Sequence, residues 1–290
     1  MGRCAVLKLG EFALSRVIES EGPLLNAAEF FPGSDPEVFR THAHWLQPTH
    51  VDPKTGMLIL CMQSYVLKTP RHTILVDACV GNDKDRAAHR MSWHKQSWPY
   101  LANLKAAGFR PEDIDIVLCT HLHTDHVGWN TKLENGRWVP TFPNARYIFA
   151  RKEYAFWEAR AKSGQPQSFL DSVLPIVEAK RHVLVEGDHQ IDNGVWFEPA
   201  PGHTEGNVVL NVQSGGDRAV LCGDVIHHPV QLVHPEWSSR ACEDKALSAV
   251  TRRALLDRLC DSATHLAPAH FASPSIGRVV RDRNHFGYRT

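Results

Sequence analysis

The chain has 290 residues, of which 43% are hydrophobic and 22% are charged, a composition typical of a globular protein. Its 32 Lys and Arg residues equal its 32 Asp and Glu residues in number, so no net charge favours a nucleic acid or an anionic membrane as the partner. No apolar run approaches the roughly 20 residues needed to cross a bilayer.

The cysteines indicate a compartment. The chain has 7 of them, scattered and never spaced as CxxC, and several lie inside apolar runs. This usage is typical of reduced cysteines that pack in the core of an intracellular protein. The first 20 residues also lack the apolar core of a secretion signal. We therefore predict a cytoplasmic protein.

The elements expected along the chain begin with a Pro-rich, irregular segment at about residues 20–55, which we interpret as a long surface excursion, a lid or an interface element. Short apolar runs bounded by turn residues then predict β-strands. These runs cover residues 57–69, 72–81, 114–121, 145–150, 182–187 and 194–200. Residues 207–226 form two further apolar runs joined by the turn SGGD, the pattern of a β-hairpin.

Helices are predicted between these strands. Residues 97–109 end at a Gly before a Pro, and residues 151–161 have apolar side chains three and four positions apart. Residues 243–262 place Leu247, Val250, Ala254 and Leu255 on one predicted helix face. Strands in antiparallel pairs with helices inserted favour stacked sheets flanked by helices over one doubly wound parallel sheet. We expect a single domain over residues 1–290.

The stretch THLHTDHVGWN at residues 120–130 places three histidines and an aspartate within six positions. It starts where an apolar strand ends, and side chains two apart on a strand point the same way, so His121 and His123 can share one target. Asp125 and His126 follow a turn, and Gly128 lets the chain leave tightly. Imidazole and carboxylate are ligands that Zn²⁺ prefers. The pattern predicts a metal site, against a proton relay or a solvated loop.

Three more candidate ligands stand at the ends of apolar runs elsewhere in the chain. His203 lies in PAPGHTEGN, Asp224 in AVLCGDVIHH and His270 in THLAPAHF. Each of them alone is typical of a polar loop residue. Their presence together with the first motif favours one metal centre built from all of them.

The motifs HLHTDH, PGHTEGN, GDVIHH and PAHF, in this order, resemble those of the metallo-β-lactamase-fold hydrolases, over about residues 55–285. The resemblance implies an α+β four-layer αββα sandwich, with two mixed β-sheets flanked by helices, and a dinuclear centre of two divalent ions, Zn²⁺ first and Mn, Co or Fe as alternatives. Carried over by motif, the first ion takes His121, His123 and His203, the second takes Asp125, His126 and His270, and Asp224 bridges both.

Within this superfamily, LKAAGFRPEDIDIVLCTHLHTDHVG and the closing residues resemble the branch of the methyl parathion hydrolases and N-acyl-homoserine lactonases. This branch implies a hydrolase (EC 3) in which a metal-bridging hydroxide attacks a lactone, a carboxylic ester or an activated phosphotriester. Asp125 is expected as both ligand and proton acceptor. An aspartate, Asp224, stands where true β-lactamases of this fold carry a cysteine near the site, which disfavours antibiotic hydrolysis.

One departure from the lactonases concerns the substrate carbonyl. Those lactonases place a tyrosine three residues after the bridging aspartate, and this chain has His227 there, followed by His228. An imidazole can donate a hydrogen bond or act as a general acid, or His227 can be a structural group. Trp129, Trp237 and Trp45 are candidates for the wall of a pocket for a small apolar or aromatic substrate. Analogy with the branch also suggests a homodimer.

Other functions share parts of this pattern. Hydrolytic dehalogenation of an activated chloroaromatic uses the same kind of metal centre, and the tryptophans together with GDVIHHP are compatible with it. A di-iron redox protein usually brings a further domain that does not fit in this length. A metal-binding protein without activity is disfavoured by the intact ligand set. Balanced charge disfavours the RNA-processing nucleases of this fold, and the closing residues disfavour glyoxalase II.

Overall fold

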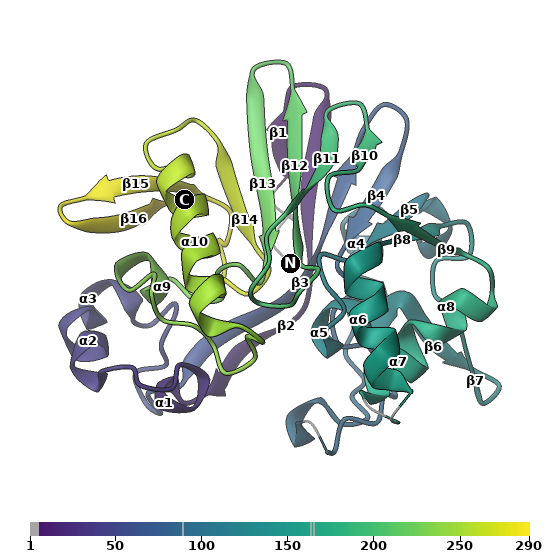
Figure 1. Cartoon of the computed structure of the whole chain (residues 1–290), viewed down its shortest axis with the longest axis horizontal. Helices are drawn as coiled ribbons and strands as arrows, with labels where there is room; N and C mark the ends of the chain where they lie inside the picture. Colours follow the sequence, from purple (N-terminus) through teal and green to yellow (C-terminus); the bar gives the residue numbers. More distant parts are fainter. Residues whose placement is uncertain (1–5, 89, 163, 165) are drawn as a thin grey trace. The chain divides into compact units, whose positions relative to one another are not determined.

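The structure is a computed structural model that describes residues 6–88, 90–162, 164 and 166–290 (Figure 1). The described residues form two compact units. Unit 1 lies within residues 1–20 and 62–189, and unit 2 comprises residues 21–61 and 190–290. Each unit is therefore built from two separate stretches of chain. The single domain expected over residues 1–290 stays a prediction.

A seven-stranded mixed sheet spans the described part of unit 1, in the order β1-β2-β3-β4-β5-β8-β9. β1 pairs with β2 and β3 pairs with β4 in antiparallel fashion, whereas β4, β5, β8 and β9 are parallel. β2 and β3 continue into unit 2. The strands are β1 Val6–Leu9, β2 Phe12–Leu25, β3 Leu58–Lys68, β4 Thr73–Val76, β5 Ile116–Leu118, β8 Arg146–Ala150 and β9 His182–Val185.

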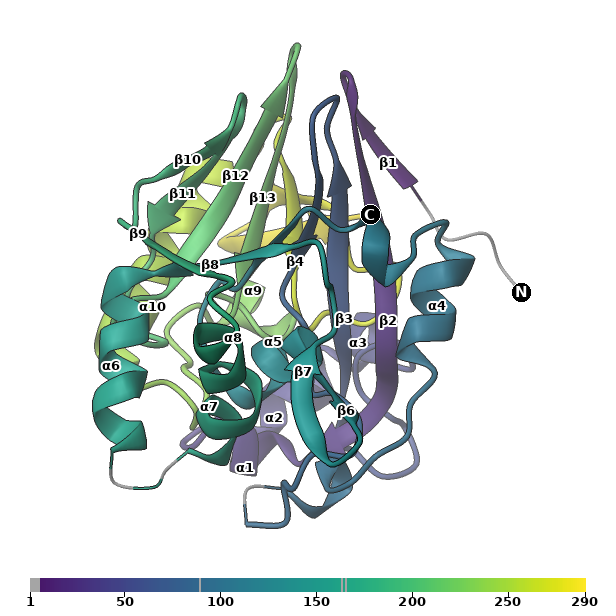
Figure 2. The same cartoon turned by 90° about the vertical axis from the view of Figure 1, so that its right-hand side faces the viewer.

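Helices pack on this sheet. Figure 2 shows α6, α7 and α8 grouped together in unit 1. The buried apolar residues of β4, β5 and β8 form one core with residues of α4 and these helices. The remaining elements of the unit are η1 Met91–Trp93, α4 Tyr100–Ala106, η2 Pro111–Asp113, α5 Thr124–Val127, η3 Gly128–Asn130, the hairpin β6 Thr131–Glu134 and β7 Arg137–Pro140, α6 Arg151–Ala161, α7 Gln167–Ser172 and α8 Leu174–Glu178.

Unit 2 contains a second mixed sheet of five strands among its described residues, in the order β10-β11-β12-β13-β14. The first four strands are antiparallel, and β14 is parallel to β13. Figure 1 shows α10 packed beside β13 and β14. The elements are β10 Gln190–Asp192, β11 Val195–Pro199, β12 Val208–Ser214, β13 Asp217–Gly223, α9 Val230–Val233, α10 Lys245–Leu259, β14 His265–Pro268 and the hairpin β15 Arg278–Asp282 and β16 His285–Arg289.

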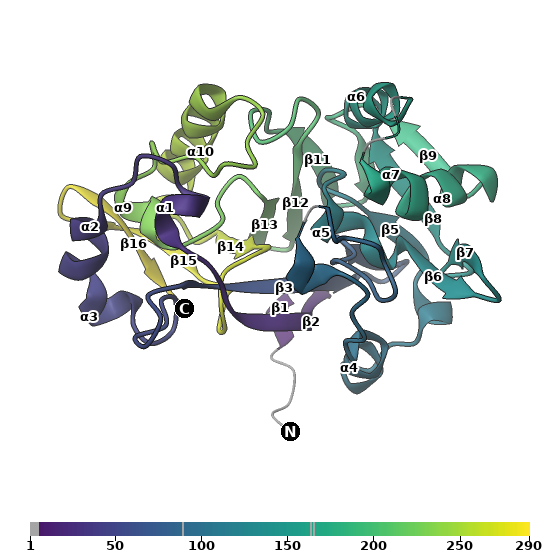
Figure 3. The same cartoon turned by 90° about the horizontal axis from the view of Figure 1, so that it is seen from below.

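The segment at residues 20–55 is more regular than the sequence suggested. β2 runs into it, and three short helices follow, α1 Ala27–Phe30, α2 Pro36–Thr41 and α3 Ala43–Leu46. The side chains of Asn26 and Asp35 accept hydrogen bonds from the first turns of α1 and α2, which explains where these helices begin. Phe31 and Leu46 are buried. Figure 3 shows these helices beside β16 and α9 of the same unit.

The predicted mixed sheets with flanking helices are confirmed. The hairpin at residues 207–226 is confirmed as β12 and β13, which meet at the pair Ser214 and Asp217. The helix predicted within residues 243–262 is confirmed as α10. Of the residues expected on one of its faces, Leu255 is buried, whereas Val250 is 65% and Leu247 39% exposed. α10 instead buries Arg252, whose guanidinium donates to the carbonyls of residues 235 and 225 and to a serine hydroxyl.

Five of the six cysteines among the described residues are buried, as predicted. Cys4 lies outside the described residues. Within the part of the chain that the structure describes, no helix combines the length and the apolar character that a membrane span requires.

Candidate metal centre

The predicted motif at residues 120–130 follows β5 in unit 1. All three residues of β5 are buried, as expected for a strand between two parallel neighbours. The chain then turns into α5, which carries Asp125 and His126. The carboxyl end of a central strand thus delivers His121 and His123, and the following helix delivers the other two side chains.

His121 and His123 present ring nitrogens close together. Nε2 of His121 lies 3.0 Å from Nδ1 of His123, and the two rings meet edge to face. On the other side of its ring, Nδ1 of His121 is 3.1 Å from the hydroxyl oxygen of Thr120. This contact holds His121 with Nε2 directed at the space that it shares with His123.

His126 is oriented by a carboxylate that the sequence analysis did not single out. Nδ1 of His126 lies 2.9 Å from Oδ2 of Asp77, and the His126 ring is buried. Asp77 follows β4 directly and also accepts hydrogen bonds from the amide and hydroxyl of Thr120. An outer carboxylate of this kind fixes the tautomer of a ligand imidazole and leaves Nε2 for a metal. In the sequence Asp77 is a single carboxylate inside the apolar run 72–81, with no motif around it.

Gly128 allows the tight turn that follows the motif. A Cβ atom at this position would lie 1.8 Å from the carbonyl oxygen of Val80. The amide of Gly128 donates to the carbonyl of Cys79, and the amide of Trp129 donates to the carbonyl of Ala78. The turn after the motif is therefore pressed against the loop that follows β4.

Glu19 holds the same loop from the other side. Its carboxylate accepts hydrogen bonds from the amides of Val80 and Gly81 and from the indole of Trp129. Glu19 is 4% exposed, and burial raises its pKa to about 7 against the effect of these hydrogen bonds. Trp129, a predicted pocket residue, is buried and stacks on Tyr100. Its role in substrate binding stays a prediction.

Unit 2 supplies His203, Asp224 and His270. Asp224 and His270 follow β13 and β14, and because these strands are parallel their carboxyl ends meet at one edge of the sheet. Oδ1 of Asp224 lies 3.0 Å from Nε2 of His270, and Oδ2 lies 3.2 Å from Nε2 of His203. All three side chains are buried. The structure thus places two imidazoles around one buried carboxylate.

Each of these imidazoles is held by its other nitrogen. Nδ1 of His270 donates to the carbonyl oxygen of Cys61, at 2.9 Å, and Nδ1 of His203 lies 3.4 Å from Sγ of Cys242. In both rings Nε2 is the nitrogen that faces Asp224. Ligand histidines in metal sites show this division between an inner nitrogen and an outer partner.

The charges in unit 2 favour a cation. Burial lowers the pKa of His203, but the Asp224 carboxylate and the Cys242 thiol raise it, to about 10 on balance. The Asp224 carboxylate thus favours positive charge beside it, although the setting is buried. A divalent ion can supply that charge in place of the proton, and imidazole with carboxylate is the donor set that such ions take. The residues present fit a metal.

Within each unit, predicted ligands gather closely enough to contact a common ion. His121 with His123, Asp125 with His126, and His203 with Asp224 each offer donor atoms within 4.8 Å of one another. His270 joins Asp224 at the distance given above. All seven predicted ligands therefore lie beside another member of the set in their own unit.

His227 and His228 have different surroundings. Nε2 of His227 is 3.3 Å from Oδ2 of Asp224, and the ring meets the edge of Phe30. Burial lowers the pKa of His227 to about 4, in opposition to Asp224. His228 points elsewhere, since its Nε2 donates to the carbonyl oxygen of His50 at 2.8 Å. His227 is therefore in place to act beside Asp224, whereas the ring of His228 joins two segments of unit 2.

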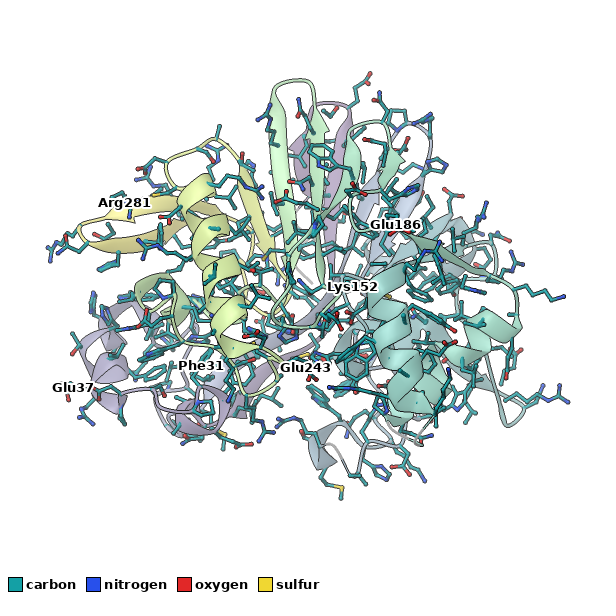
Figure 4. The ribbon with its side chains drawn as sticks, in the orientation of Figure 1. Phe31, Glu37, Lys152, Glu186, Glu243 and Arg281 are labelled. Carbon is teal, nitrogen blue, oxygen red and sulfur yellow. The ribbon has the colours of Figure 1, made fainter. Side chains whose placement is uncertain are left out.

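The other two predicted tryptophans lie in unit 2. Trp237 stacks on His234 and packs near Phe31, which is labelled in Figure 4. The indole of Trp45 donates to Nδ1 of His42 and lines a cavity of about 690 Å³. Phe271 also lines this cavity. A part in substrate binding stays a prediction for both tryptophans.

Sequence reasoning missed several residues that support the site. Each of them is separated in the sequence from a group that it contacts, so the spacing of residues within a motif does not identify it. They are Glu19, Asp77, Glu153, Ser239 and Cys242. Glu153, for example, accepts hydrogen bonds from the amide of Leu122 and the indole of Trp157, which fixes the loop between His121 and His123.

The comparisons with known proteins point to one family. A family model described as "Metallo-beta-lactamase superfamily" matches residues 63–258. An N-acyl homoserine lactonase of Bacillus cereus is 30% identical over 179 residues, which cover 57% of this chain and 64% of that one. A second such lactonase, from Agrobacterium fabrum, is 36% identical over 66 residues, which cover 20% of this chain and 22% of that one. The chain spans less than two thirds of the length of these relatives.

Solved structures agree in fold over nearly the whole chain. The dizinc quorum-quenching lactonase AidC, in complex with a product, matches with a TM-score of 0.81 at 21% identity, covering 98% of this chain and 96% of that one. The hydrolase AbOPH of the β-lactamase superfamily also matches at 0.81, with 20% identity and 100% and 97% coverage. At such low identity these likenesses show the fold alone, and the fold is the predicted metallo-β-lactamase fold.

Proposed function

Because this chain belongs to the metallo-β-lactamase superfamily, we propose that it is a hydrolase with a dinuclear metal centre. One ion would be held by three imidazoles, those of His121, His123 and His203. The other would be held by Asp125, His126 and His270, and both would share the Asp224 carboxylate. Zn²⁺ is the first candidate, since the donor set suits it and AidC is described as a dizinc enzyme.

The observation that carries this proposal is the arrangement around Asp224. Imidazole nitrogens of His203, His227 and His270 lie 3.0 to 3.3 Å from its oxygens, in a buried setting. A carboxylate in such a setting is stable only with compensating positive charge. Divalent ions held there would supply that charge, and they would also polarise the group under attack and lower the pKa of water toward neutrality.

The protein's own groups then have distinct tasks. Asp125 follows the imidazole pair on α5 and accepts the proton that the attacking water gives up. Asp224 would contribute its carboxylate to both ions. His227, neutral near pH 7 because burial lowers its pKa to about 4, donates a hydrogen bond to the substrate oxygen that gains charge.

We propose lactones, carboxylic esters and activated phosphotriesters as the substrate class. Lactones are our first candidates in this class, and the similarity to relatives named N-acyl homoserine lactonase supports this choice. The aromatic side chains around His227 and Trp237, among them Phe30 and Phe31, suit a substrate with an apolar or aromatic part. Dehalogenation of an activated chloroaromatic is the second candidate, because the same aromatic side chains suit an aromatic substrate. A homodimer also stays a prediction.

Metal analysis combined with a substrate panel tests the proposal. We expect two equivalents of a divalent metal and turnover of an N-acyl homoserine lactone, an aryl ester or an aryl phosphotriester that a chelator abolishes. His121→Ala should lose metal and roughly 100-fold or more of the activity. His189→Ala, which changes an exposed histidine of the same unit, is the control and should behave like the unchanged protein.

Other results would overturn parts of the proposal. Full activity of His121→Ala, or a protein that binds no metal, would exclude the metal-dependent hydrolase. Chloride release from a chlorinated aromatic nitrile, without turnover of lactones or esters, would favour the dehalogenase. Iron that cycles between redox states would identify the redox alternative.

A further inference from the structure

The outer side of His203 carries a contact unlike those of the other ligand histidines. His121 meets a hydroxyl there, His126 a carboxylate and His270 a backbone carbonyl. His203 instead meets a thiol, with Nδ1 3.4 Å from Sγ of Cys242. Its Nε2 faces Asp224. The ring is thus held between a sulfur on one side and the proposed metal position on the other.

The backbone brings this sulfur into place. The amide of Glu243 donates to the carbonyl of His203, and the amide of Asp244 donates to the carbonyl of Gly202. Gly202 has a φ of +123°, and a Cβ atom there would lie 2.3 Å from the amide nitrogen of Ser248 in the first turns of α10. The loop of His203 therefore packs directly on residues 242–248, which a larger residue at position 202 would prevent.

Two serines surround the sulfur. Oγ of Ser239 and Oγ of Ser248 each lie 3.4 Å from Sγ of Cys242. Ser239 also lies 3.4 Å from Nε2 of His227. One buried network therefore joins His203 and His227 through Cys242 and Ser239, and both of its imidazoles contact Asp224.

We propose that Cys242 is a positioning residue of the metal centre. Its sulfur accepts the hydrogen bond that Nδ1 of His203 donates, while the two serine hydroxyls donate to the same sulfur. This fixes the His203 ring with Nε2 toward the metal. Ser239 extends the same restraint to His227. The inference rests on the proposed function, since it concerns the geometry of the metal ligands.

Two other roles for Cys242 fit the distances less well. A cysteine that bound the metal itself would approach the ions from the side of Nε2, and Sγ lies on the side of Nδ1. A cysteine that only filled space would have apolar neighbours. Cys222, for comparison, is buried in the apolar cluster around β13 and β14.

Substitution of Cys242 tests the role with a readout other than turnover. We expect Cys242→Ala to weaken Zn²⁺ binding roughly 10-fold to 100-fold in competition with a chelating dye, the range typical of outer partners of ligand histidines. The visible spectrum of the Co²⁺-loaded protein should shift as well. Cys242→Ser, whose hydroxyl oxygen can still accept the hydrogen bond, should restore affinity to within a few-fold of the unchanged protein.

Two controls separate positioning from packing. Cys222→Ala removes an equally buried thiol in the apolar cluster around β13 and β14, and Cys260→Ala removes the half-buried thiol at the end of α10. Both should keep the Co²⁺ spectrum, even where Cys222→Ala lowers the free energy of unfolding. If Cys242→Ala binds Zn²⁺ as tightly as the unchanged protein, or if Cys242→Ser fails to restore binding, the positioning role is excluded.

The unchanged protein offers a second test that requires no variant to fold. In the Zn²⁺-loaded protein, nitrogen NMR should identify His203 as the tautomer with the proton on Nδ1, and that proton should resist exchange with water. Metal attached to Nδ1 would overturn the inference. A protein that binds no metal at all would refute the proposed function, whereas normal metal binding with an unaffected Cys242→Ala variant would refute the inference alone.

Discussion

At the scale of single residues, Glu19 shows how much one buried carboxylate can hold. It accepts three hydrogen bonds, two of them from the loop after β4 and one from Trp129. Glu19→Ala leaves three buried donors without that acceptor, so we expect the free energy of unfolding to fall by about 3 kcal/mol or more. Urea denaturation measures this. Glu178→Ala, an exposed position of the same unit, should change it by less than about 0.5 kcal/mol.

Lys84 makes the stability of the protein depend on pH. Its ammonium is buried over the ring of Trp138, with Thr131 and Asp171 as hydrogen-bond partners, and burial lowers its pKa to about 7 against the pull of Asp171. The unfolded chain keeps the ordinary pKa of lysine and therefore binds more protons between about pH 7 and 10. The folded protein is therefore stabilised relative to the unfolded chain above about pH 10, where Lys84 is neutral in both. This stability is lost as pH falls from about 10 to 7.

The comparison with Lys84→Met isolates this effect. The free energy of unfolding of the unchanged protein, minus that of the variant, should rise as pH increases from about 7 to 10. Denaturant titrations at several pH values measure it. Lys105→Met, which removes an exposed lysine of α4, should show no such trend. A difference that falls with pH would contradict the depressed pKa.

At the scale of the elements, the turn after α5 depends on the absence of a side chain. Gly128→Ala would place a Cβ atom 1.8 Å from the carbonyl oxygen of Val80, so one of the two loops has to move. We expect a loss of about 3 kcal/mol of unfolding free energy. His126, two residues earlier, would move too, so Zn²⁺ affinity should drop. Gly216→Ala, in the β12–β13 turn with open space around it, is the matched control and should be neutral.

How far the sequence predicts each element depends on how local its signal is. The hairpin of β12 and β13 was predictable, because an apolar pattern and its turn lie within 20 residues. The buried face of α10 was not. Arg252 is buried there because carbonyl groups of a distant loop accept its hydrogen bonds, and the apolar Val250 faces outward in its place. Tertiary hydrogen bonds determine which side of α10 is buried, and the spacing of apolar residues along the helix does not reveal these bonds.

The same distinction holds for the candidate site. His121, His123 and His126 follow from their spacing within one short motif. Cys242 and Asp77 do not, since the histidines that they hold lie 39 and 49 positions away in the chain. Their sequence neighbours are ordinary strand-end and loop residues. A fold is needed to bring such partners together.

At the scale of the whole molecule, bound metal should stabilise the folded chain, because the unfolded chain does not hold the ligand groups together. Removal of the metal with a chelator should therefore lower the unfolding temperature, which calorimetry measures. Metal at about 100 times its dissociation constant contributes about 2.7 kcal/mol. His121→Ala should respond much less to the chelator. Identical unfolding temperatures with and without the chelator would argue against metal binding by the folded protein.

The way the chain is divided between its units has a consequence for protein synthesis. Unit 1 can be completed once residue 189 has left the ribosome, but residues 21–61 belong to unit 2, whose sheet begins only at residue 190. The helices of this early segment, with Phe31 and Leu46, must wait for more than 130 further residues before their partners exist. A nascent chain therefore exposes Phe31 and Leu46 until those residues are made, and transiently exposed apolar surface of this kind is what chaperones protect.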